Sequence, residues 1–65
     1  MTPAEVTPAA SEYLAGFDDH EPIIAIARRG TSDEDDDRLE EVYGEDWLAV
    51  ALEIQRLCRE RVGLD

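Results

Sequence analysis

Residues 47–62 read WLAVALEIQRLCRERV, and this stretch has the clearest periodic pattern in the chain. Because an α-helix turns by about 100° per residue, residues spaced by three and four positions lie on one face. The apolar residues of the stretch follow that spacing, and Gly63 comes directly after it as a typical helix stop. We therefore predict an amphipathic helix over 47–62. Its apolar face consists of Trp47, Val50, Ala51, Ile54, Leu57 and Cys58.

The apolar arc of this helix is wide, because Leu48, Leu52 and Val62 extend it on one flank. Two interpretations are open. In the first, one part of the arc packs on the rest of the chain and another part remains for a partner. In the second, the upstream helices cover the whole arc. We favour the first interpretation.

A second helix is predicted immediately upstream. Ser32 can cap its N-terminus, and the acids of residues 33–36 lie at the positive end of the helix dipole. Gly44 then leaves two alternatives. An interior glycine costs a helix about 1 kcal/mol relative to alanine, so the helix can end there. The apolar seam nevertheless stays in phase through residue 44, and one helix over 33–62 would be about 45 Å long. A continuous helix of that length implies a dimer or a larger assembly, because one chain is too small to cover it. The apolar stripe of the upstream segment consists of Leu39, Val42 and Tyr43.

The first half of the chain gives weaker signals. Residues 1–6 contain little to anchor them, and we expect a flexible N-terminal tail followed by a single helical domain over 7–65. Ala10, Tyr13, Leu14 and Phe17 have helical spacing and predict a short helix from Pro8 to about Ala15.

Residues 23–27 form a compact apolar block whose type is ambiguous. Its three isoleucines favour a strand, whereas Pro22 ahead of it and Arg28, Arg29 and Gly30 behind it are typical of a helix. We favour the helix. The predicted fold class is all-α, a small bundle of three to four helices, with a long C-terminal helix used for dimerisation if residue 44 does not break it.

Length and charge restrict the function. A 65-residue domain is marginally stable, and with the single cysteine Cys58 it cannot form an internal disulfide. Seventeen acidic residues against six arginines give a net charge of −11, which repels phosphate backbones and anionic membranes. We expect no direct nucleic-acid binding, no membrane association, a cytoplasmic location and a homo-oligomer.

The charge is concentrated between residues 31 and 46. This segment contains nine carboxylates and one arginine, so its net charge is −8 out of the total of −11. Such a block can dock on a basic protein surface and steer the encounter. Trp47, beside this block, is either an interface anchor or a core residue, and its phase favours the core. The predicted partner-binding residues are Asp33, Glu34, Asp35, Asp36, Asp37, Glu40, Glu41, Glu45, Asp46, Trp47, Leu48 and Leu52.

Metal and cofactor sites are not predicted. Asp33, Asp35 and Asp37 match the first ligands of a calcium loop, but Arg38 and Gly44 occupy positions that need glycine and glutamate. His20 has acidic neighbours but no second histidine, and we expect Cys58 to act as a small core hydrophobe. Without lysine, Schiff-base chemistry and a lysine-bearing phosphate loop are excluded.

The sequence therefore predicts a non-enzymatic adaptor or inhibitor that binds a basic surface of a protein partner. In a more specific form, its carboxylates mimic nucleic-acid phosphates. The alternative is a self-associating subunit whose acidic surface serves only solubility or adaptation to a saline cytoplasm.

Overall fold

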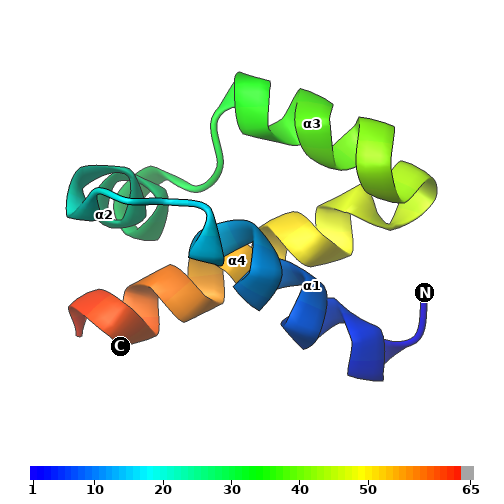
Figure 1. Cartoon of the computed structure of the whole chain (residues 1–65), viewed down its shortest axis with the longest axis horizontal. Coiled ribbons are helices and arrows are strands. Elements are labelled where there is room, and N and C mark those ends of the chain that lie inside the picture. Colours follow the sequence, from blue (N-terminus) through cyan, green and yellow to red (C-terminus); the bar gives the residue numbers. More distant parts are fainter. Residues whose placement is uncertain (64–65) are drawn as a thin grey trace.

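The computed structural model describes residues 1–63 and confirms the all-α class (Figure 1). Its elements are α1 (Pro3–Ala15), α2 (His20–Arg29), α3 (Asp33–Tyr43), the short 3-10 turn η1 (Gly44–Asp46) and α4 (Trp47–Val62). No helix among the described residues is long and apolar enough to span a bilayer.

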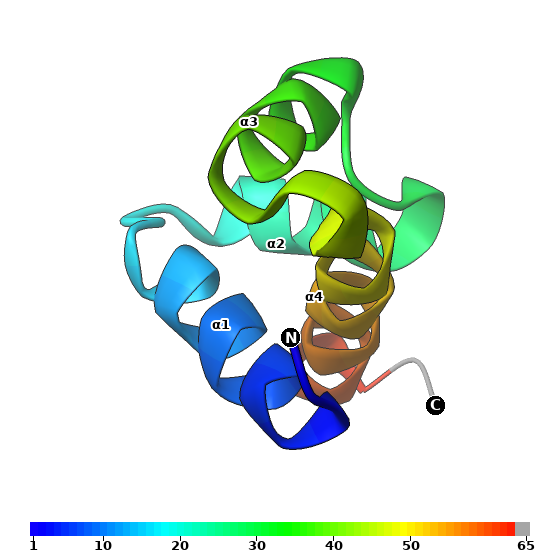
Figure 2. The same ribbon diagram turned by 90° about the vertical axis from the view of Figure 1, so that its right-hand side faces the viewer.

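Helix α4 is the element on which α1, α2 and α3 all pack (Figure 2). The side chains of Val50, Ile54 and Cys58 are fully buried, and they lie on the apolar face that the periodicity of 47–62 predicts. Trp47 and Leu57 flank that face and are half-buried against it. The other three helices supply the rest of the core: Ala10, Leu14, Ile23, Ile26, Ala27 and Leu39.

Residues 23–27 lie in a helix, which confirms the prediction of a helix rather than a strand for this segment. Ile23, Ile26 and Ala27 are spaced by three and four residues along α2 and are buried. The helix ends at Gly30, whose N–H donates to the carbonyl of Ile26 at 2.8 Å.

The expected flexible tail over residues 1–6 is corrected by the structure, because α1 begins at Pro3. Thr2 precedes the helix in extended conformation, and the N–H of Glu5 donates to its carbonyl at 2.9 Å. The Met1 amine also pairs with Asp46 at 3.0 Å, which ties this end of the chain to the turn before α4. Pro3 is the first helical residue, a position that suits proline because its φ is already helical and no partner for an N–H is needed there.

Gly44 separates α3 from α4. Its φ of +60° and ψ of −127° lie where L side chains are strained, and its N–H donates to the Glu40 carbonyl. The chain reverses direction here, and α3 packs on α4 instead of extending it (Figure 1). The predicted alternative of one continuous helix over 33–62 is therefore not the arrangement adopted.

Candidate interaction surface

The rotation of α3 is fixed at its first turn. The Ser32 hydroxyl accepts a hydrogen bond from the Asp35 N–H at 3.2 Å, and the Ser32 N–H donates to the Asp35 carboxylate at 3.3 Å. This reciprocal capping box satisfies two backbone donors that a helix start otherwise leaves unpaired. Near the middle of the helix, Leu39 is almost fully buried. Tyr43, at the end of the helix, is half-buried against the same core, and the cap and these two residues determine which side of α3 meets solvent.

Five carboxylates occupy the solvent side of α3. They recur at i, i+1, i+4, i+7 and i+8, a spacing that places them on one helix face, and all five residues are exposed. In helical rotation they lie opposite Leu39, so they point away from the core. We call this surface the acidic face: Asp33, Glu34, Asp37, Glu40 and Glu41.

Three of the nine predicted carboxylates are half-buried and bonded within the chain. Asp35 accepts a hydrogen bond from the Tyr13 hydroxyl of α1, and Asp36 accepts one from the Thr31 hydroxyl at 2.5 Å. Asp46 pairs with the terminal amine of the chain. These three acids support the fold, whereas Glu45 in η1 is exposed beyond the end of the acidic face.

The Tyr13–Asp35 hydrogen bond joins α1 to α3, two helices that otherwise pack chiefly on α4. Burial, and then the bond to Asp35, raise the pKa of Tyr13 to about 12. Burial alone would raise the pKa of Asp35, but the hydrogen bonds from Tyr13 and Ser32 outweigh it and lower that pKa. The carboxylate is thus held ionised while the phenol is held neutral.

The predicted apolar contributors to the surface are divided. Trp47 is half-buried against the core, which agrees with the core interpretation and not with an exposed anchor. Leu48 and Leu52 are 52% and 60% exposed, one helical turn apart on α4. The upstream helices therefore leave part of the wide apolar arc uncovered. Because Trp47 is half-buried, it does not connect the acidic face and the two leucines into one exposed patch.

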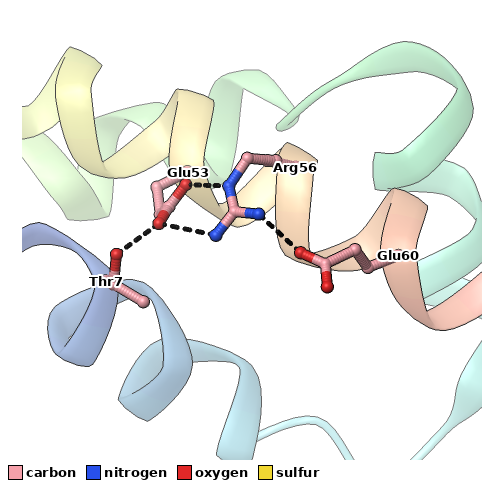
Figure 3. Close-up of polar contacts among 4 residues, drawn as sticks. All are labelled: Thr7, Glu53, Arg56 and Glu60. Atoms are coloured by element: carbon pink, nitrogen blue, oxygen red, sulfur yellow. Dashed lines mark hydrogen bonds and ion pairs between the residues drawn. The ribbon is translucent and has the colours of Figure 1, made fainter. Parts of the chain in front are cut away.

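A polar cluster between α1 and α4 was not predicted (Figure 3). The Arg56 guanidinium donates to Glu53 and to Glu60, and the Thr7 hydroxyl donates to Glu53 from α1. Arg56 first, and then Thr7, lower the pKa of Glu53 to about 2. The spacing of Glu53, Arg56 and Glu60 indicates ion pairs along one helix, but nothing local in the sequence connects Thr7 to them.

The residues considered for metal binding or nucleophilic chemistry lie apart. His20 is exposed at the first residue of α2, while Cys58 is buried in the core, which raises the pKa of its thiol. Of the three calcium-loop positions, Asp35 is already bonded to Tyr13 and Ser32. Within residues 1–63, no three His, Cys, Asp or Glu side chains converge as metal ligands.

Comparison with known proteins assigns the chain to no family. No protein-family model matches it, and no curated protein or solved structure gives a significant match.

Proposed function

We propose that the protein is a non-enzymatic interaction protein whose acidic face binds a basic surface of a partner protein. The observation that carries the proposal is the five exposed carboxylates on one side of α3. The ion pairs found within residues 1–63 involve Asp46, Glu53 and Glu60, and none uses a carboxylate of the acidic face. Within the described part of the chain, no ion pair therefore neutralises the charge of this face.

The way α3 is held supports this proposal. Its capping box, its bond to Tyr13 and the burial of Leu39 fix the helix before any partner arrives. A charged face that is already ordered costs little conformational entropy on binding and adds electrostatic steering. If the partner surface also binds nucleic acid, the carboxylates occupy the places of phosphates and the protein acts as an inhibitor.

Affinity capture with the full chain as bait tests the proposal. The first variant combines Asp37→Asn, Glu40→Gln and Glu41→Gln, which removes three charges from the acidic face. The matched control combines Asp18→Asn, Asp19→Asn and Glu21→Gln, which removes three charges from exposed residues near the start of α2. We expect a basic protein to bind the wild type and the control, to be released by salt, and to be lost with the first variant.

Two outcomes contradict the proposal. One is a partner that binds the acidic-face variant as well as it binds the wild type. The other is an affinity that does not change from low to high salt, because added salt screens exposed charges: the Debye length falls from about 10 Å at 0.1 M to about 3 Å at 1 M. Adding an oligonucleotide as competitor distinguishes the two forms of the proposal. If it displaces the protein from its partner, the acidic face mimics nucleic acid; if it does not, the protein is a simple acidic adaptor.

A further inference from the structure

The outward side of α4 carries a row of side chains that the bundle does not cover. Leu48, Leu52 and Arg56 follow one another at intervals of four residues, so they lie on one helix face. Both leucines are more than half exposed, as is the Arg56 side chain. A shallow groove of about 480 Å³ borders Leu52 on the side of α1. Its apolar lining comes from Met1, Pro3, Val6 and Ala49.

Electrostatics favours a second copy of the chain at this row. The whole chain carries a net charge of −11, so two copies repel each other at most orientations. The surface around this row is the exception, because its charges nearly balance. Arg56 and the Met1 amine lie there with Glu53, Glu60 and Asp46, whereas Arg59 and Arg61 of α4 lie on the side of α2. Two copies that approach through α4 keep their acidic faces on α3 out of the contact.

The row is also complementary to itself when read in the opposite direction. If two α4 helices pack antiparallel around a two-fold axis near residue 50, Leu48 of each copy lies opposite Leu52 of the other. The same axis brings Arg56 of each copy beside the η1 turn of the other, where Glu45 is exposed. Arg56 uses three of its five N–H donors on Glu53 and Glu60, which leaves two for this contact.

We propose that a second copy of this chain docks on the Leu48–Leu52–Arg56 row, forming an antiparallel two-fold dimer with the leucines at its centre. The area predicts weak association. A standard interface covers about 800 Å² per partner, which is close to a fifth of the 4454 Å² that one chain exposes. The leucines, the groove and Met1 form a smaller patch than this, so the dimer depends on concentration. The dimer is independent of the function proposed for the acidic face.

Sedimentation equilibrium of the full chain, up to about 1 mM, tests the dimer. We expect the weight-average mass to rise from one chain toward two, and to rise further in high salt because salt screens the net repulsion between the copies. The double variant Leu48→Gln, Leu52→Gln keeps the net charge and should remain monomeric while its circular dichroism stays helical. Val42→Gln is the matched control, since Val42 is 71% exposed on α3, and it should dimerise like the wild type.

Cross-linking tests the register. Chains carrying Leu48→Cys and chains carrying Leu52→Cys are mixed and oxidised, and the antiparallel dimer predicts mixed disulfides in excess of random pairing. Random pairing or an excess of like pairs refutes this register. A wild type that is monomeric at all concentrations and salts, or a leucine variant that dimerises normally, refutes the dimer. Neither result affects the acidic-face proposal, whose partner binding weakens with salt and does not require the leucines.

Discussion

The hydrogen bond between Tyr13 and Asp35 provides a quantitative test of how α3 is held. Asp35→Ala removes both the acceptor for the Tyr13 hydroxyl and one half of the capping box at Ser32. A cap contributes about 1 kcal/mol, and Asp35 supplies only one of the two reciprocal bonds of this box, so its loss costs about half of that. A half-buried hydrogen bond to a charged group contributes about 1.5 kcal/mol, the lower end of its range. We expect a loss of about 2 kcal/mol in the free energy of unfolding, or about 8–16 °C in Tm for a domain of this size.

Urea denaturation followed by circular dichroism measures this loss. Asp37→Ala is the matched control, because Asp37 carries the same charge two residues later on the acidic face and is exposed. Its effect should stay within about 0.5 kcal/mol. Tyr13→Phe alone should cost about 1.5 kcal/mol, and combining it with Asp35→Ala should cost less than the sum of the two. Equal effects at positions 35 and 37, or strict additivity with Tyr13→Phe, would refute the role assigned to this bond.

Three further predictions concern the pH dependence, the turn and the core. The folded pKa of Glu53, about 2, lies below its ordinary 4.5, so the stability it contributes is present above pH 4.5 and should be lost as the pH falls toward 2. Comparing urea midpoints of wild type and Glu53→Gln across that range should show a shallower acid loss in the variant. Gly44→Ala forces a side chain into positive φ and should cost about 1–2 kcal/mol in urea melts. An unchanged midpoint would count against the turn geometry. Ile54→Ala empties a fully buried position and should cost about 2–5 kcal/mol. Calorimetry should then find a large loss of Tm, and a small loss would refute the enclosure of residue 54 in the core.

The elements that the sequence predicts well are those whose pattern is local. The period of 47–62 identifies the buried face of α4, because four of its six predicted residues are fully or almost fully buried. The residues on either side of 23–27, Pro22 ahead and Arg28, Arg29 and Gly30 behind, also identify α2 correctly as a helix. The sequence predicts that α1 begins at Pro8, whereas the helix begins at Pro3, beside the ion pair between the Met1 amine and the distant Asp46.

For the candidate surface, too, the sequence predicts the local pattern but not the contacts between distant residues. The sequence locates the acidic run, but it does not distinguish the acids that face solvent from those bonded within the chain. Asp35 differs from Asp37 only through Tyr13, which lies 22 residues away, and through its place in the capping box. Glu53 and Thr7 are likewise 46 positions apart. Pairings at that separation depend on how the helices pack, which the periodicity of a single segment does not encode.

The position of α4 along the chain has a consequence for biosynthesis. The three earlier helices pack chiefly on this one, and it is translated after them. A nascent chain that ends before residue 47 has no surface on which to bury Leu14, Ile26 and Leu39. We therefore expect the domain to fold in one step once residues 47–62 have left the ribosome, and to remain a target for chaperones and proteases until then.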